Sequence, residues 1–375
     1  MIKTHFTIFS FALAFLFANS LHAMEEGKYS SLAVKQISLS PLDYSTEAVI
    51  GSNVGIRPKR AGGIRLEIKT LDDKAIIHNY GHGGAGVTLA PGCVEKAVSL
   101  LNQEEPDKKS VSVIGAGYMG LLTALRLTDE GYTVKVYADQ FPQSDYFYQE
   151  GKPCITSLVA GGLWYPMGVE HGEDETLFKS LQQDSFNYYK NVIDTSKHPG
   201  VSFRKAYSFS AQGDPQFPDE LAAPIPVKVE FGNQHYTPAR EWSTILIDGN
   251  IFLNHLYNSL KEKNVTFEQK KFSTNEDILK LEDTYIFNCT GYGSKYLFDD
   301  NALKPIRGQL LYLKPQPSFD YFLFGGDGSF SVFPSSDKIT IWGTYEEGVD
   351  TLEIEPAELG KMREKVASFF KDKIH

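Results

Sequence analysis

The sequence contains few cysteines and no excess of positive charge. Its 375 residues include only Cys93, Cys154 and Cys289, with no Cys-x-x-Cys pair, so we expect neither a disulfide framework nor a structural zinc site. The formal net charge of −10 argues against a nucleic-acid partner, because phosphate contacts need clustered Lys and Arg. There is also no repeat and no low-complexity tract. The composition, 42% hydrophobic and 22% charged, is typical of a folded protein of about two domains.

The first 23 residues have the three-part pattern of a secretory signal peptide. Lys3 precedes the apolar run 6–18, and Ala23 provides a small residue where a peptidase could cut. The run is too short for a membrane span of about 20 residues, and a buried N-terminal helix is the alternative. We therefore expect residues 1–23 to be removed, the protein to be secreted or periplasmic without a membrane span, and residues 24–46 to form a tether before the first ordered element.

A βαβ unit follows a charged linker. The linker covers residues 103–110, and the next segment, 111–114, is typical of a buried strand. Helical apolar spacing over 115–129 and a second strand at 134–137 complete the unit, which indicates a parallel sheet. By contrast, residues 201–250 are strand-like with Pro and Gly between the strands, which predicts a mainly antiparallel second domain.

The turn of the βαβ unit matches a dinucleotide-binding pattern. Gly115, Gly117 and Gly120 form Gly-x-Gly-x-x-Gly between the strand and the helix. The first glycine permits the tight turn, the second lets a pyrophosphate approach the backbone, and the third allows close helix–strand packing. Asp139 follows the second strand, where a carboxylate can accept ribose hydroxyls. The pattern alone does not separate FAD from NAD.

Several segments together resemble the D-amino-acid oxidase family, which binds FAD. They are VYAD (136–139), GGLW (161–164), IFNCTG (286–291), PIRGQ (305–309), the signature HNYGHGGAGVT (78–88), and GIRPKR with IRLE (55–60 and 64–67). The resemblance implies an α/β fold, with a Rossmann-type FAD-binding domain and a mainly antiparallel α+β substrate domain.

The order of these segments differs from that family. Its members begin with Gly-x-Gly-x-x-Gly and end near HNYGHGG, whereas here the signature comes first. Circular permutation gives this order, and it is tolerated where chain termini lie close on the surface. The expected FAD-binding domain comprises residues 72–165 and 282–304. The expected substrate domain comprises 47–71, 166–281 and 305–375.

The resemblance also implies roles for individual residues. Arg57 would pair with the substrate α-carboxylate through its bidentate guanidinium. The Gly84 carbonyl would accept a hydrogen bond from the substrate amine. Gly83 and Gly86 would let the backbone approach the flavin, and a helix starting near Thr88 would direct its N-terminus at the reduced flavin.

The remaining site expectations concern the cofactor, the carboxylate and a possible metal. Gly162 and Leu163, in the GGLW segment, are expected at the FAD. Ser331 stands where the family has a tyrosine that helps Arg to hold the carboxylate. His78 and His82 are four residues apart, but the glycines around them argue against the helix that would bring them together, so no metal is expected.

The implied reaction is FAD-dependent oxidative deamination of D-amino acids. The products would be 2-oxo acids, ammonia and hydrogen peroxide, with oxygen as the electron acceptor. Two alternatives remain: a flavin oxidase of N-substituted glycine or proline-like amines, and an FAD-binding protein without oxidase activity. The sequence does not give the oligomeric state.

Overall fold

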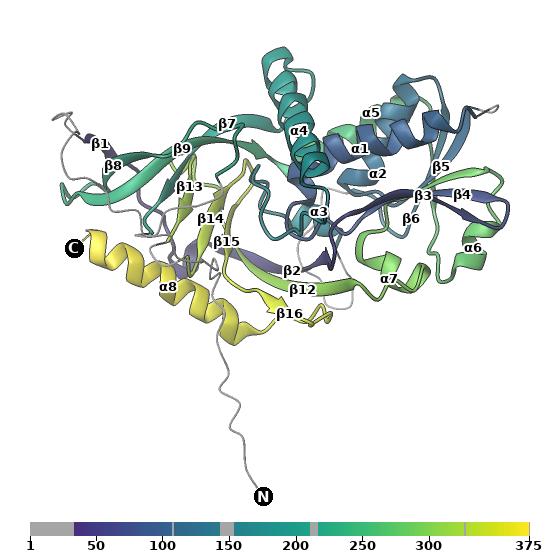
Figure 1. Ribbon diagram of the computed structural model, residues 1–375. Coiled ribbons are helices and arrows are strands. Elements are labelled where there is room, and N and C mark those ends of the chain that lie inside the picture. Colours follow the sequence, from purple (N-terminus) through teal and green to yellow (C-terminus); the bar gives the residue numbers. More distant parts are fainter. Residues whose placement is uncertain (1–33, 107–108, 143–153, 211–216, 326–327, 375) are drawn as a thin grey trace, which may run out of the picture.

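The computed structural model describes residues 34–106, 109–142, 154–210, 217–325 and 328–374. The expected signal peptide lies outside these residues, so cleavage and secretion stay predictions. None of the helices in these ranges is long and apolar enough to cross a membrane. Two sheets, one of six strands and one of ten, organise the described part of the chain (Figure 1).

The six-stranded sheet contains the predicted βαβ unit. Its strand order is β10-β6-β5-β11-β4-β3. Five neighbouring strands are parallel and β3 is antiparallel to β4, so the predicted parallel sheet is confirmed. The strands are β3 (Arg65–Leu71), β4 (Lys74–Tyr80), β5 (Ser110–Ile114), β6 (Thr133–Ala138), β10 (Thr266–Gln269) and β11 (Tyr285–Asn288).

Helices cover both faces of this sheet, so the central strands β5 and β11 are buried at every residue after their first. One face carries α1 (Gly86–Gln103), α2 (Tyr118–Asp129) and α5 (Gly249–Glu262), and α4 (Glu175–Thr195) packs on α1 (Figure 1). On the opposite face, Ile278 of α6 (Asn275–Leu279) packs with Ile76 and Ile286. The predicted linker falls between the end of α1 and the start of β5.

The sheet pairing and packing place two strands, and helices α5 and α6, differently from the expected domain division. The segments 47–71 and 166–281 were assigned to the substrate domain. However, β3 pairs with β4 along its whole length, and β10 pairs with β6 from Thr266 to Gln269. Helix α5 packs on α2. Backbone pairing at a sheet edge, rather than chain proximity, therefore decides which domain these elements join.

The ten-stranded sheet is mainly antiparallel, as predicted. Its order is β1-β8-β9-β7-β13-β14-β15-β12-β16, and β2 also pairs with β12. Only the pairs β1–β8 and β7–β13 of these described strands are parallel. The strands are β1 (Lys35–Ser38), β2 (Val49–Arg60), β7 (Val201–Ser208), β8 (Ile225–Glu230), β9 (Thr237–Ile247), β12 (Leu303–Leu313), β13 (Phe322–Phe324), β14 (Ser331–Pro334), β15 (Ile339–Trp342) and β16 (Glu346–Glu347).

The C-terminal helix α8 (Pro356–Ile374) runs beneath this sheet (Figure 1). Its residues Val366 and Phe370 are fully buried in the core that the helix shares with the sheet. The expected tether at 24–46 is wrong from residue 35 onward, because β1 pairs with β8 and Leu42 is buried in the same core. Residues 24–33 of that segment lie outside the described ranges.

Two long strands connect the sheets. Strands β2 and β12 are antiparallel and lie side by side, paired from Leu303↔Arg60 to Leu313↔Val49 (Figure 1). The chain continues from β2 into β3 and β4 of the six-stranded sheet. It reaches β12 from β11 through η2 (Gly291–Gly293) and α7 (Ser294–Leu297). These strands therefore carry their side chains to the junction between the sheets.

Candidate active site

A cavity of about 1070 Å³ lies at this junction. From the six-stranded sheet and its connections it is lined by residues that include Gly115, Gly117, Met119, Asp139 and Thr290. From the ten-stranded sheet it is lined by residues that include Arg57, Lys59, Phe333, Trp342 and Tyr345. Its volume lies just above the range of about 300–1,000 Å³ found for small-molecule and cofactor sites. The position outside the carboxyl ends of parallel strands is where open α/β sheets bind their ligands.

The predicted glycine turn forms one wall of the cavity. Gly115 has φ +115° and a side chain there would collide with the Cys289 carbonyl oxygen, so only glycine fits. A Cβ on Gly117 would lie 2.7 Å from Ser157 Oγ. Gly120 does not line the cavity; a Cβ there would collide with the Gly115 carbonyl oxygen, so its role is the close packing of α2 on β5.

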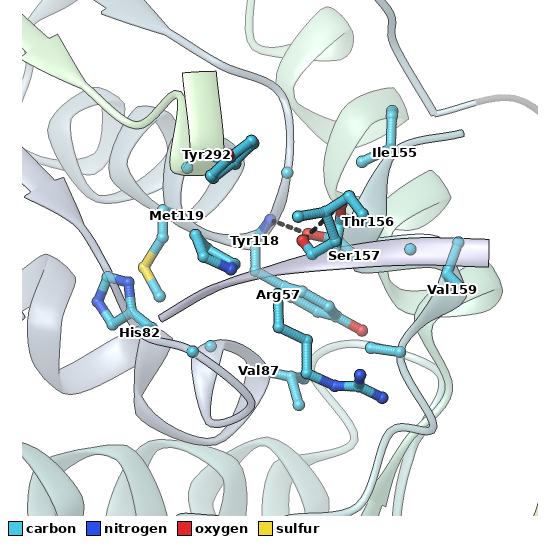
Figure 2. A pocket seen from close by; sticks show the side chains of 18 of the residues that line it. Arg57, His82, Val87, Tyr118, Met119, Ile155, Thr156, Ser157, Val159 and Tyr292 are labelled. Atoms are coloured by element: carbon cyan, nitrogen blue, oxygen red, sulfur yellow. Dashed lines mark hydrogen bonds between the residues drawn. The ribbon is translucent and has the colours of Figure 1, made fainter. Parts of the chain in front are cut away.

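Two hydroxyl residues that the sequence interpretation missed lie beside this turn. Thr156 and Ser157 begin the short helix α3 (Thr156–Val159) and line the cavity. Ser157 Oγ accepts a hydrogen bond of 3.2 Å from the backbone N–H of Tyr118, at the N-terminus of α2 (Figure 2). Peptide N–H groups at a helix N-terminus, together with hydroxyls, are suited to bind phosphate. The available sequence signal was a Thr-Ser pair shortly before GGLW.

The far end of the cavity carries charged side chains from two strand ends. Asp139 follows β6, is exposed, and lines the cavity as predicted for a ribose-binding carboxylate. Lys270 and Lys271 follow the neighbouring strand β10 and line the same region. These lysines were not among the predicted site residues, because β10 was assigned to the other domain.

The glycine-rich segment after β4 lies against the strand that carries Arg57. Gly83 N donates to the Pro58 carbonyl at 2.9 Å, and Gly84 N donates to the Gly168 carbonyl at 3.0 Å. A Cβ on Gly84 would lie 3.7 Å from Arg57 Cδ, so these two residues are direct neighbours in the cavity wall. Gly83, Gly84 and Gly86 all line the cavity, and α1 begins at Gly86.

The structure divides the remaining predicted residues into two groups. Gly162 and Leu163 line the cavity. Thr88 does not: its buried hydroxyl donates to the Tyr165 carbonyl at 3.0 Å and accepts from Tyr165 N at 3.1 Å. Thr88 therefore holds the GGLW segment in place. Ser331 is buried on β14 and is likewise absent from the lining among the described residues, so its expected role at the carboxylate stays a prediction.

Arg57 is a buried cation in the cavity wall. No carboxylate among the described residues lies within ion-pair distance of it, and its Nη1 atom is buried without a hydrogen-bond partner. The guanidinium lies over the Trp342 ring, 5.2 Å from the centroid. Burial lowers the pKa of Arg57 to about 10, so the group stays charged at neutral pH. A buried unpaired charge is costly, and a carboxylate ligand would compensate it.

The two histidines of the signature segment are both buried. His78 Nδ1 lies 3.0 Å from Asn288 Nδ2, and burial lowers the pKa of His78 to about 3. His82 lines the cavity, and burial lowers its pKa to about 3 as well, so it is neutral. Within the described ranges, no group of three or more His, Cys, Asp or Glu side chains could hold a metal ion.

The cavity residues fit a flavin dinucleotide. Gly115 and Gly117 leave room at the α2 N-terminus, Asp139 stands at the adjacent strand end, and apolar walls continue toward Arg57. The family described as FAD dependent oxidoreductase matches residues 110–374. The chain belongs to this family. Its cofactor is FAD, and Arg57 and Gly84 lie in the segment before the matched range.

Individual relatives agree with this assignment. The D-amino-acid oxidase of Streptomyces coelicolor is 27% identical over 251 residues, which is 66% of this chain and 73% of the relative. The human D-aspartate oxidase is 24% identical over 262 residues, 64% of this chain and 70% of the relative. Among solved structures, the iminodiacetate oxidase from Chelativorans sp. BNC1 has a TM-score of 0.50 and 12% identity, covering 69% of this chain and 78% of that one. That likeness concerns the fold.

Proposed function

We propose that this FAD-dependent oxidoreductase oxidises D-amino acids to 2-oxo acids, with ammonia and hydrogen peroxide as the other products. The observation that supports this most is the Arg57 guanidinium beside Gly84 in the cavity, which has no carboxylate partner in the part of the chain that the structure describes. The D-amino-acid oxidases among its relatives, at 24–27% identity, agree with it.

The residues of the chain orient the substrate and exclude water. Arg57 binds the α-carboxylate with its planar fork, and the Gly84 carbonyl accepts a hydrogen bond from the neutral amine. Leu163, Phe333 and Trp342 provide an apolar wall around the reacting carbon. Bound FAD supplies the oxidising centre that accepts a hydride and passes two electrons to oxygen. No side-chain base is needed when the amine arrives neutral, because the cofactor supplies the chemistry and the protein the orientation.

A flavin oxidase of N-substituted glycines or proline-like amines is the second candidate. Lys59 lines the cavity two residues along the same strand from Arg57, although it pairs with Glu170 at 3.6 Å. Two cations on one face suit substrates with two carboxylates, and the iminodiacetate oxidase shares the fold. A protein that binds FAD without turnover is the third.

Substrate panels separate these candidates. The FAD-loaded protein is mixed with D-amino acids, the matching L-amino acids, sarcosine, D-proline and iminodiacetate, and hydrogen peroxide is measured. We expect peroxide from D-amino acids and little from L-amino acids. Turnover confined to secondary amines favours the second candidate. If the flavin spectrum changes with none of these amines under anaerobic conditions, the protein is a binding protein.

We further propose that the element order arose by circular permutation. The signature strand β4 precedes β5 in the chain, yet it occupies an inner position of the sheet, parallel to β11. The segment that carries Arg57 and Gly84 also precedes the matched range 110–374.

A further inference from the structure

A second cation lies on the same strand as Arg57. Lys59 is two residues further along β2, and both residues line the cavity. Side chains two residues apart on a strand point to the same face, and their Cα atoms are about 6.6 Å apart. The register shift in the β2–β12 pairing lies between Tyr312 and Leu313, at the other end of the strands. The cavity wall therefore has two cationic groups, of which the proposed reaction uses only Arg57.

The contacts of Lys59 leave its ammonium group accessible to a ligand. Its ion-pair partner is Glu170, with 3.6 Å between Lys59 Nζ and Glu170 Oε1, which exceeds the usual length of a hydrogen bond, about 2.7–3.2 Å. The other oxygen, Glu170 Oε2, accepts a hydrogen bond of 2.9 Å from Gly62 N. The Glu170 side chain is 43% exposed, so water weakens its attraction to Lys59. An ammonium group has three donors, and a carboxylate in the cavity can accept from it.

The residue opposite Lys59 on the neighbouring strand is also a cation. Lys59 pairs with Lys304 of β12, so their side chains lie on the same face of the sheet. Like charges directly opposite each other repel, and an anion between them relieves this repulsion. Glu347, a carboxylate of the lining, lies at the level of Arg57 instead, because both are opposite Ile306. The charges around Lys59 therefore favour a second anionic group in the ligand.

We propose that Lys59 binds the side-chain carboxylate of an acidic D-amino acid, so that D-glutamate and D-aspartate are preferred to their amides. This inference rests on the proposed function, because Arg57 holds the α-carboxylate of the same substrate. A substrate side chain that extends from Arg57 along β2 brings its carboxylate toward Lys59. The amide of D-glutamine has the same shape but no charge, so it forms a weaker hydrogen bond with the ammonium group.

The test compares D-glutamate with D-glutamine in the full chain loaded with FAD. The ratio of their kcat/KM values measures recognition of the second carboxylate, because the two substrates differ only in that group. We expect the parent to favour D-glutamate by about tenfold, the effect typical of a hydrogen bond between charged groups, and Lys59→Met to lose this preference. Lys59→Arg, which keeps the charge, should retain most of it. The dissociation constants of glutarate and of its monoamide, followed by the flavin spectrum without turnover, should change in the same way.

The matched control is Lys69→Met. Lys69 is exposed on β3, pairs with Glu67 at 3.4 Å and is not among the described residues that line the cavity. This variant loses the same charge and should keep the parental ratio. An equal fall of the ratio in both variants would overturn the inference, since it indicates a general effect of net charge.

Two further outcomes separate this inference from the proposed function. A parent that oxidises D-alanine but does not distinguish D-glutamate from D-glutamine would overturn the inference and leave the proposed function intact, as would a parental ratio in Lys59→Met. If the parent oxidised no D-amino acid, the proposed function would fail. The comparison of glutarate with its monoamide would then still decide whether Lys59 binds a second carboxylate.

Discussion

The guanidinium of Arg57 occupies the space that a side chain at position 308 would need. Gly308 lies on β12 and Arg57 on the paired strand β2, opposite Ile306. A Cβ on Gly308 would collide with the terminal nitrogens of Arg57. The glycine of the PIRGQ segment thus allows Arg57 to lie across β12 and reach Trp342.

This relationship predicts the effect of Gly308→Ala. The added methyl should displace the Arg57 guanidinium and so misplace the substrate carboxylate. We expect kcat/KM for D-amino acids to fall by about 100-fold, since a misplacement of about 1 Å has that order of effect. FAD affinity should be unchanged. Steady-state peroxide assays and FAD titration of the apoprotein provide the measurements.

The control for this substitution is Gly360→Ala. Gly360 lies in α8, and nothing is within 4 Å of a Cβ built on it. We expect unchanged activity and a stability gain of up to about 1 kcal/mol, as for other glycines replaced in helix interiors. Parental activity in Gly308→Ala would show that Arg57 tolerates displacement, which contradicts the role given to it.

Replacing Arg57 tests the carboxylate site directly. Arg57→Leu should leave folding and FAD binding intact and abolish turnover of D-amino acids, because the carboxylate loses its cation. Arg57→Lys should recover little, since Lys lacks the planar fork that fixes the substrate. Amines without a carboxylate should be poor substrates of the parent and should be little affected. D-amino-acid turnover that does not respond to Arg57→Leu would show that the carboxylate is held elsewhere.

Asp139→Ala tests the cofactor end of the cavity. The carboxylate is exposed at the end of β6, lines the cavity and is predicted to accept ribose hydroxyls. Charge-assisted hydrogen bonds contribute about 1.5–3 kcal/mol, so the dissociation constant of FAD should rise by about 10- to 100-fold. Quenching of flavin fluorescence on binding to apoprotein measures it. Asp219→Ala, at an exposed residue outside the lining, should change nothing, and an equal effect of both would remove the specific role of Asp139.

The local sequence pattern was sufficient to predict the central strands of the six-stranded sheet, but it did not identify the strands at the edges. The strand, glycine turn and helix at 111–129 are adjacent in the chain, so their spacing carried the information. Strand β10 is far from β6 in sequence, and nothing within Thr266–Gln269 indicates which sheet it joins. Lys270 and Lys271 were missed for the same reason.

The site shows the same limit. Arg57, Gly84 and Asp139 could be named because each belongs to a recognisable segment. Ser331 was chosen by position in the family pattern, but the lining depends on which strand faces the cavity. Tyr345 lines the cavity, whereas its neighbours Thr344 and Glu346 are hydrogen-bonded to Gln309 on β12. Only the strand register reveals this relationship.

His198 should make the protein less stable in mild acid. His198 is buried, and its Nδ1 atom lies 2.9 Å from Nε2 of His255. Burial lowers the pKa of His198 to about 4. The unfolded chain protonates near pH 6.5 whereas the folded state does not, so stability falls as pH decreases from about 6.5 toward 4. A single histidine can lower the free energy of unfolding by at most about 1.4 kcal/mol for each pH unit. We expect His198→Gln to reduce the loss of unfolding free energy between pH 7 and pH 5, measured with urea.

The exposed His235 offers the matched control. His235→Gln should show the parental dependence on pH. His78 and His82, whose pKa values burial also lowers, remain in both variants, so part of the acid sensitivity persists. An unchanged slope in His198→Gln would mean that His198 is protonated in the folded state.

Relinking the chain tests the circular permutation. Lys35 of β1 pairs with Val227 of β8, and the Lys373 carbonyl accepts from Asn233 Nδ2 at 2.6 Å in the turn after β8. Both ends of the described chain therefore contact one hairpin, and a Gly/Ser linker of about 15 residues, with a mean span of about 21 Å, can join them.

The new ends are placed between Gln103 and Ser110, where α1 stops and β5 begins. We expect this variant to begin with β5 and Gly-x-Gly-x-x-Gly, to fold with native far-UV circular dichroism and to bind FAD with parental affinity. A matched variant opened instead within β12 should not fold, because that strand pairs with β2, β15 and β16. If the 103–110 variant also failed while the parent was stable, simple rotation of the family order would be excluded.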